Sequence, residues 1–471
     1  MTKQIFPSIS RSLKKEKLTM SQTINRRNFF AVTGLGLGTA ALAACGGPST
    51  AGTAVKTTST DWSKVTPAAK ITFMSSHPGK SGDIEAALIK DFEAANPGIK
   101  VDLVTGGANY EEVAQKFQTA QAGNNVPDVV VASDVWWFRY AIAETVMPVD
   151  DLLAAVGDKS SEFNETLFGD YNYADKHWAV PYARSTPLFY YNKDHFKAAG
   201  LPDRAPTTWD EFATWAPKIQ AANAGNAGYQ HAYQYPALAG YAGWTLQNVL
   251  WGQGGGWSNK WELTANSTAS VKAMTWVQQT IVKDGWAGVS SKDAVSDMTA
   301  GAVSATVSST GDLVGTLKAA KTANVNIGVG FLPGGAVSAS PVCPTGGAGL
   351  VIAAKTSPER QLAAAKFVSF VTNAANTAKF SAATGYMPVR KDADMSAVLA
   401  TTPQIQVALD QLKVTRSQDY GRVFLPGADL EMANAAAKIM NEKADVATTL
   451  GALQDKLDGI YTKTVKPKLT S

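Results

Sequence analysis

The residues that most often carry catalysis or bind metals are few and scattered in this sequence. The four histidines lie far apart, and there is no HExxH zinc motif, no Cys/His cluster and no G-x-S-x-G nucleophile turn. Asp134 and Glu144 stay open as an acid/base pair, but the sequence gives them no geometry. We therefore expect no metal, no cofactor and no enzymatic activity.

Two glycine-rich stretches were tested as phosphate-binding loops. Gly79–Ser81 follows an apolar run, but the first glycine of a Walker motif would have to stand at Met74. A turn that directs backbone N–H groups toward an anion stays open at this place. Gly34–Gly38 follows no predicted strand and lies within the N-terminal apolar run from Phe29 to Ala44. Neither stretch indicates a nucleotide-binding protein.

Tryptophan is frequent, and its distribution is uneven. Two of the twelve tryptophans, Trp136 and Trp137, are adjacent. Four more lie close together in the sequence, at Trp244, Trp251, Trp257 and Trp261. Large aromatic rings in a cleft stack on sugar faces or attract a quaternary ammonium through the ring quadrupole. Core packing accounts for some of these rings equally well, so the pattern favours a small organic ligand without identifying it.

Composition and charge exclude several classes of protein. The chain has 471 residues, 45% of them hydrophobic and 17% charged, which excludes collagen, coiled coil, disordered and polytopic membrane proteins. Residues 1–44 hold seven Lys or Arg and one Glu, so the formal charge of +4 becomes −2 once they are set aside. A mildly acidic body lacks the basic surface that nucleic acid requires, and we expect no nucleic-acid partner.

The N-terminal segment has the features of an export signal. Arg26 and Arg27 resemble a twin-arginine signal, and the apolar run from Phe29 to Ala44 is too short to span a bilayer comfortably. We expect residues 1–44 to be a signal peptide.

The signal ends at a cysteine. Leu42–Gly46 resembles a bacterial lipoprotein cleavage box, so Cys45 is the predicted lipidation site. Residues 45–68, rich in Ser, Thr, Ala and Gly, then form a flexible tether to the outer face of the cell membrane. Cys343 is expected to be a buried free thiol.

After residue 69 the apolar pattern alternates between strands and helices. Strands are predicted at 71–74, 99–103 and 129–131, separated by helices with apolar stripes. This β-α-β-α-β order predicts a parallel sheet, and ligands of such sheets collect at the carboxyl ends of the strands. Those ends carry His77–Ser81, Tyr110 and Asp134. Further helices are predicted at 209–222 and 358–372, and further strands at 303–307, 327–332 and 350–352.

The body of the chain resembles one family in several ordered segments. These segments are Trp178–Tyr182, Ser185–Asp194, Pro206–Phe212, Ser308–Gly311, Gly346–Gly347 and Thr384–Val389. They are similar to the family 1 extracellular solute-binding proteins of ABC importers. Within it, Ser185–Pro187, Thr384–Tyr386 and Arg422 look most like the UgpB-type branch, which takes up sn-glycerol 3-phosphate or glycerophosphocholine. Residues 223–241 depart from the family pattern.

The resemblance implies an α/β fold with two lobes, of the type II periplasmic-binding-protein kind, with a hinge and a ligand cleft between the lobes. It implies that residues 69–184 and 311–372 form lobe 1, and that residues 185–310 and 373–471 form lobe 2.

The resemblance also implies the ligand-binding residues, which are Tyr110, Asp134, Ser185, Trp244, Ser309, Gly347, Tyr386 and Arg422. Arg422 and the hydroxyls of Ser185, Ser309 and Tyr386 would face phosphate oxygens, with the amide of Gly347 nearby. Asp134 would accept hydrogen bonds from glycerol hydroxyls, and Trp244 would lie against choline.

The implied role is a monomeric binding lipoprotein of an ABC importer. It would capture a glycerophosphodiester or sn-glycerol 3-phosphate and deliver it to a membrane permease that has a cytoplasmic ATPase. An oligosaccharide such as maltose or trehalose stays open as the alternative ligand.

Overall fold

The computed structural model describes residues 60–123, 125–338 and 342–469. The predicted signal peptide 1–44, the lipidation site Cys45 and all of the tether before residue 60 lie outside these ranges. Within the ranges, none of the helices has the length and apolar character needed to cross a membrane.

The first lobe is built on a five-stranded sheet in the order β2-β1-β3-β15-β6. Its first three strands run parallel, whereas β15 runs antiparallel to both β3 and β6. The predicted β-α-β-α-β unit with parallel strands is therefore confirmed, but the whole sheet is mixed because β15 joins it antiparallel. The elements are β1 (Lys70–Ser76), α1 (Pro78–Ala95), β2 (Lys100–Gly107), α2 (Tyr110–Gln121), β3 (Val129–Ser133), β6 (Val180–Ser185) and β15 (Gly346–Ile352).

Apolar periodicity and capping account for these elements. Phe73 on β1 and Phe92 on α1 are both fully buried. The ring of Phe367 packs on both of these rings and so joins the strand to the helix. The side chain of Asn109 accepts a hydrogen bond from the backbone N–H of Glu112, which caps the start of α2. This cap fixes where α2 begins, and so places Tyr110 at the sheet edge.

The second lobe has its own five-stranded sheet, in the order β11-β8-β12-β7-β13. Strands β11, β8 and β12 are parallel, and β7 is antiparallel to both β12 and β13. The strands are β7 (Pro187–Asn192), β8 (Tyr233–Tyr235), β11 (Ala287–Val289), β12 (Ala305–Ser309) and β13 (Ile327–Gly330).

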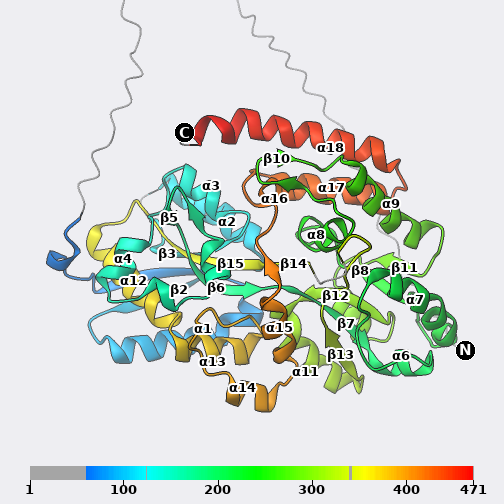
Figure 1. The fold of residues 1–471 in the computed structure, drawn as a ribbon. Helices are drawn as coiled ribbons and strands as arrows, with labels where there is room; N and C mark the ends of the chain where they lie inside the picture. The colour runs from blue at the N-terminus through cyan, green and yellow to red at the C-terminus, as the bar shows by residue number, and fades with distance from the viewer. Residues whose placement is uncertain (1–59, 124, 339–341, 470–471) are drawn as a thin grey trace, which may run out of the picture. The chain divides into compact units, whose positions relative to one another are not determined.

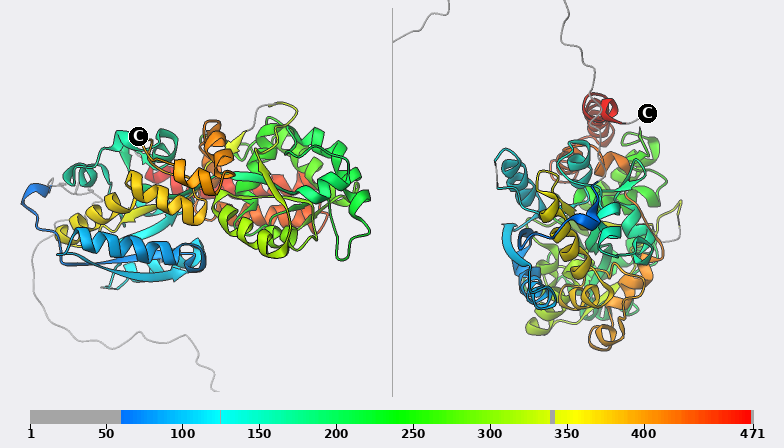
Figure 2. Two further views of the ribbon diagram at one scale, coloured as in Figure 1. Left: turned by 90° about the horizontal axis from the view of Figure 1, so that it is seen from below. Right: turned by 90° about the vertical axis from the view of Figure 1, so that its left-hand side faces the viewer.

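Helices cover both sheets (Figures 1 and 2). Besides α1 and α2, those of the first lobe are α3 (Trp137–Ile142), α4 (Asp150–Ala155), α5 (Glu165–Gly169), α12 (Pro358–Val371) and α13 (Ala374–Thr384). Those that follow in the second lobe are α6 (Lys193–Ala198), α7 (Trp209–Asn223), α8 (Ala242–Gly252), α9 (Thr268–Val282), α10 (Ala294–Thr299) and α11 (Leu313–Ala323). The C-terminal part adds α14 (Ser396–Thr401), α15 (Ile405–Leu412), α16 (Tyr420–Val423), α17 (Ala428–Met440) and α18 (Val446–Ile460).

The predicted division of the chain into lobes differs from the structure in two places. Residues 311–330 were expected in lobe 1, but β13 pairs with β7 in the sheet of lobe 2. The start of the segment 373–471 was expected in lobe 2, but α13 packs on α1, where Lys379 forms an ion pair with Asp91 at 2.9 Å. Periodicity identifies a strand or a helix but not its partner, which is why both boundaries were wrong.

The chain crosses between the lobes more than once. Strand β6 belongs to the first sheet and β7 to the second, so the buried Thr186 is the link between them. After β13 the chain returns to β15 in the first sheet. Its C-terminal part packs α17 and α18 on lobe 2, and the Tyr173 hydroxyl of lobe 1 donates to the carbonyl oxygen of Lys468 at 3.4 Å. These crossings form the hinge of a two-lobed molecule.

Candidate ligand-binding site

A pocket of about 360 Å³ lies between the two sheets. All eight residues that the family resemblance implied line it. Further lining residues are His77, Lys80, Asn109, Glu111, Ser133, Val135, Ala239, Gly240, Tyr241 and Asp429. Its volume is at the small end of the range usual for sites that bind small molecules.

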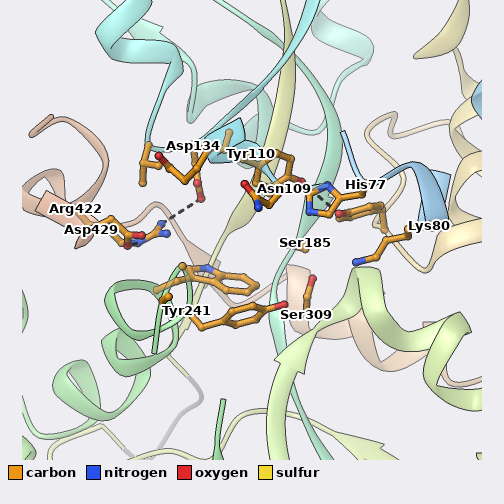
Figure 3. A pocket seen from close by; sticks show the side chains of 18 residues that line it. His77, Lys80, Asn109, Tyr110, Asp134, Ser185, Tyr241, Ser309, Arg422 and Asp429 are labelled. Atoms are coloured by element: carbon orange, nitrogen blue, oxygen red, sulfur yellow. Dashed lines mark hydrogen bonds and ion pairs between the residues drawn. The ribbon is translucent and has the colours of Figure 1, made fainter. Parts of the chain in front are cut away.

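Lobe 1 supplies residues from the carboxyl ends of its parallel strands, as expected for such a sheet. His77 and Lys80 follow β1, Tyr110 opens α2 after β2, and Asp134 follows β3. Figure 3 shows Asp134, Tyr110 and Asn109 entering the pocket from the same side. The turn after β1 is not an open anion site, because the amides of Lys80 and Ser81 both donate to the carbonyl of His77.

Lobe 2 supplies the opposite wall. Ser309 ends β12, while Tyr241 and Trp244 stand at the start of α8. Figure 3 shows Tyr241 and Ser309 facing the residues of lobe 1 across the pocket. The Trp244 indole N–H donates to the carbonyl of Thr345 at 2.9 Å, which fixes the ring while one face lines the pocket.

The crossing strands contribute Ser185 and Gly347. Ser185 is the last residue of β6, and within the described chain its hydroxyl makes no hydrogen bond, so it is free to meet a ligand. Gly347 has a φ of +100°, and a Cβ at this position would come within 2.0 Å of the carbonyl oxygen of Ala183. Only glycine fits this close approach of β15 to β6.

Arg422 is held by two carboxylates, one from each side of the cleft. Its Nε donates to Asp429 Oδ1 at 2.7 Å, and its Nη1 lies 3.4 Å from Asp134 Oδ2. The Gln418 side chain bridges the group, because it accepts from Arg422 and donates to Asp134. Among the described residues, Nη2 of Arg422 has no hydrogen-bond partner. The positive charge of Arg422 is therefore balanced before any ligand arrives.

Lys80 lies at the other end of the pocket from Arg422 (Figure 3), and it forms a second ion pair. Lys80 Nζ donates to Asp312 Oδ1 at 2.6 Å and lies 5.6 Å from the ring centroid of Tyr386. Asp312 also accepts from the hydroxyls of Ser308 at 2.7 Å and Tyr241 at 3.3 Å. Asp312 thus ties α1 of lobe 1 to lobe 2.

Three further polar side chains of the pocket are uncharged at neutral pH, namely those of His77, Tyr110 and Tyr386. Burial and the nearby Lys80 lower the pKa of His77 to about 4, so its imidazole is uncharged at neutral pH. Burial also raises the pKa of Tyr386 and Tyr110, whose hydroxyls lie 3.3 Å apart and remain donors. Since Asp134, Asp429 and Glu111 outnumber the lining cations, the wall carries a negative excess.

The catalytic and metal alternatives have little support in this geometry. Glu144 is exposed and does not line the pocket with Asp134, so the open acid/base pair is not assembled. Across the described ranges, no group of three or more His, Cys, Asp or Glu is arranged to hold a metal ion. Cys343 is a fully buried free thiol, as predicted, and burial raises its pKa.

Comparison with known proteins identifies the family. Residues 87–407 match the family model described as bacterial extracellular solute-binding protein. The chain belongs to this family. It is therefore a carrier and not an enzyme, and it captures a small solute outside the cytoplasm for an ABC permease.

Two relatives come from one branch of this family. The chain is 29% identical over 332 residues to the sn-glycerol-3-phosphate-binding periplasmic protein UgpB of Escherichia coli K12, covering 69% of this chain and 75% of that protein. It is 43% identical to UgpB from Mycobacterium tuberculosis, whose crystal structure in complex with glycerophosphocholine matches with a TM-score of 0.79, covering 84% of this chain and 99% of that one.

Sugar-binding proteins share the fold at lower identity. The GacH receptor of Streptomyces glaucescens matches with a TM-score of 0.73 at 19% identity, covering 84% of this chain and 99% of its own. Maltose-bound MalE3 of T. maritima matches with a TM-score of 0.69 at 21% identity, covering 83% and 99%. At this identity the matches establish the two-lobe fold, which confirms the predicted fold class.

Sequence reasoning missed two functional candidates. Asp429 stands in an ordinary acidic first turn of α17, and nothing in the local pattern ties it to Arg422. Tyr241 ends the segment 223–241, where the family resemblance is weak, and only its place three residues before Trp244 hinted at a shared surface.

Proposed function

We propose that this protein captures glycerophosphocholine or a related glycerophosphodiester in the interlobe pocket and delivers it to its ABC permease. The observation that carries the proposal is the composition of the pocket, where hydroxyl donors, aromatic rings and an excess of carboxylates meet. A choline phosphodiester combines one negative phosphate with one positive ammonium, so it complements this set. The 43% identity to a protein crystallised with glycerophosphocholine supports the same choice.

The phosphate would be held by neutral donors in the middle of the pocket. The free hydroxyl of Ser185 and the hydroxyls of Ser309 and Tyr386 can donate to phosphate oxygens, and the absence of a side chain at Gly347 lets backbone approach the ligand. Arg422 would add only its Nη2 edge, because Asp134 and Asp429 already balance its charge. This weakens the expectation that Arg422 is the main phosphate ligand.

The two ends of the ligand would meet different chemistry. Asp134 would accept hydrogen bonds from glycerol hydroxyls, which carboxylates bind well. Trp244 and Tyr241, whose ring centroids lie 6.1 Å apart, would face the quaternary ammonium, and each ring contributes about 0.5–2 kcal/mol in such contacts. The pocket would thus recognise a zwitterion along its length.

Transport would follow from closure of the lobes on the ligand. Residues of both lobes line the pocket, so a bound ligand stabilises the closed form, and the permease distinguishes that form from the open one. No bond is broken.

An oligosaccharide is the rival ligand. Trp244 and Tyr241 could equally stack on a sugar, and the fold is shared with maltose-binding proteins. The low sequence identity of the sugar-binding proteins argues against a sugar ligand, because neither GacH nor MalE3 is more than 21% identical to this chain.

Calorimetry separates the candidates. The protein would be titrated with glycerophosphocholine, sn-glycerol 3-phosphate, maltose and trehalose. We expect glycerophosphocholine to bind with a Kd of about 1 μM, near −8 kcal/mol, and the disaccharides to give no binding heat. Binding of a disaccharide alone would reject the proposal.

We also propose that the chain is exported by the twin-arginine route and anchored through Cys45 as a monomer. The arginine pair and the cleavage box support this, and one acyl chain holds only weakly, so a diacylated cysteine is required. A Cys45→Ser variant should move from the membrane fraction to the soluble fraction on cell fractionation, while Cys343→Ser should stay with the membrane. If both variants divide equally between the membrane and soluble fractions, the lipid anchor at Cys45 is rejected.

A further inference from the structure

Asp429 reaches the pocket through a gap that a glycine leaves. It is the second residue of α17, and a Cβ added to Gly243 on α8 would come within 2.4 Å of its Oδ1. The same Cβ would lie 3.3 Å from Arg422 Nε. The absence of a side chain at position 243 therefore gives the carboxylate room to meet the guanidinium.

The resulting cluster carries a net negative charge in a place with little water. Arg422 is 4% exposed and Asp134 8% exposed, and Asp429 is the second carboxylate on the same guanidinium. Charges in such surroundings interact more strongly than in bulk water. Lys80, the other cation of the pocket, is engaged by Asp312, so it does not offset the cluster.

We propose that Asp429 is a positioning residue that sets the charge selectivity of the cleft. By balancing Arg422, it makes the pocket favour a phosphodiester with no net charge over a phosphate monoester, which carries two negative charges. This inference rests on the proposed function, because it concerns how the same pocket chooses among glycerol phosphates.

Asp429→Asn tests the inference by removing one charge with almost no change of shape. The affinities of glycerophosphocholine and sn-glycerol 3-phosphate would be measured by calorimetry, with displacement of the first by the second where direct binding is weak. We expect the variant to shift the ratio of the two affinities toward the monoester by about tenfold, the effect of one charge at roughly 10 Å. The exposed Asp455→Asn changes the net charge of the protein equally and should leave the ratio unchanged.

A measurement on the unmodified protein covers the case in which the variant fails to fold. A phosphate monoester loses its second negative charge below a pKa of about 6. We therefore expect sn-glycerol 3-phosphate to bind about tenfold more tightly at pH 5.5 than at pH 8, with glycerophosphocholine nearly constant.

Groups of the protein that titrate near the pocket would change the affinity for both ligands. The affinity for sn-glycerol 3-phosphate is therefore compared with that for glycerophosphocholine at each pH. The pKa of His77 is lowered to about 4 by burial and by Lys80, so its imidazole stays neutral throughout this range. The carboxyl of Glu85, behind Tyr182, has a pKa raised by burial to about 7 and would act on both ligands alike. The other charged groups that line the pocket are Lys80, Glu111, Asp134, Arg422 and Asp429, and Lys80 is paired with Asp312.

The outcomes separate this inference from the proposed function. If glycerophosphocholine binds but the affinity ratio of Asp429→Asn stays within twofold of the unmodified protein, the role of Asp429 is wrong and the function stands. A monoester affinity that rises with pH would overturn the role of Asp429 in the same way. If neither glycerol phosphate binds, both proposals fail.

Discussion

At Arg422, one positive charge is shared between Asp134 and Asp429, which lie far apart in the sequence. Such a group contributes less to phosphate binding than a free guanidinium. Its removal has a large cost all the same, because two carboxylates then remain in the pocket without a counter-charge.

Arg422→Ala should weaken glycerophosphocholine binding by about 3 kcal/mol, roughly a hundredfold in Kd. Calorimetry measures this directly. Arg204, which is exposed and paired with Glu211 at 2.6 Å, is the matched control, and Arg204→Ala should leave the Kd unchanged. If Arg422→Ala raises the Kd for glycerophosphocholine by less than threefold, the role given to Arg422 and its two carboxylates is wrong.

For the residues of the site, the family pattern was informative, whereas the local pattern was not. Arg422 and Asp134 were placed in the site because they stand in recognisable positions of the family pattern. Their mutual contact was not predicted, because it joins α16 to the end of β3 across the cleft. Asp429 was missed because an acidic residue in the first turn of a helix is ordinary and carries no sign of a distant partner.

Among the elements, α1 buries a carboxyl group behind the pocket. Glu85 is 3% exposed and accepts hydrogen bonds from Ser75 at 2.6 Å and from Tyr182 at 3.2 Å. Within the described ranges it forms no ion pair. Burial accordingly raises its pKa from 4.5 to about 7.

The raised pKa of Glu85 predicts a stability that falls as the pH rises. The folded protein holds this proton more tightly than the unfolded chain, so the contribution of Glu85 is complete below pH 4.5 and is lost as the pH rises toward about 7. The loss amounts to about 3 kcal/mol of the free energy of unfolding. The free energy of unfolding of Glu85→Gln should fall less than that of the unmodified protein over the same pH interval.

Urea unfolding at pH 4.5, 6 and 8 measures this effect. The stability of Glu85→Gln relative to the unmodified protein should rise with pH, whereas Glu442→Gln, an exposed control, should show no such trend. A constant difference across the three pH values would show that Glu85 is not the titrating group.

Local pattern was sufficient for the elements but not for their pairing. The alternation at Ile71 and Phe73 and the stripe at Leu88 and Phe92 predicted β1 and α1, because each period reflects one buried face. The lobe to which β13 belongs depends on hydrogen bonds to β7, more than 130 residues earlier in the chain. No local period encodes that pairing, so the predicted boundary at residue 311 was wrong.

For the molecule as a whole, two ion pairs connect the lobes at opposite ends of the pocket. Asp134 meets Arg422 at one end, and Lys80 meets Asp312 at the other. Both pairs form only when the lobes are close together. They therefore add to the stability of the closed form independently of the ligand.

Lys80→Met should shift the ligand-free protein toward open forms. We expect a larger radius of gyration by small-angle X-ray scattering and a severalfold weaker apparent affinity for glycerophosphocholine, because less of the protein is then competent to close. Lys379→Met removes an ion pair with Asp91 inside lobe 1 and should change neither quantity. An unchanged radius of gyration in Lys80→Met would show that this ion pair does not hold the lobes together.

In the proposed function, the interlobe pocket holds a zwitterionic phosphodiester by neutral donors around its phosphate. A crystal structure of the protein grown with glycerophosphocholine tests it most directly. We predict phosphate oxygens about 3 Å from the hydroxyls of Ser185 and Ser309, with the ammonium group against Trp244. A phosphate seated on Arg422 and away from these hydroxyls, or a pocket that excludes the compound, would contradict the account.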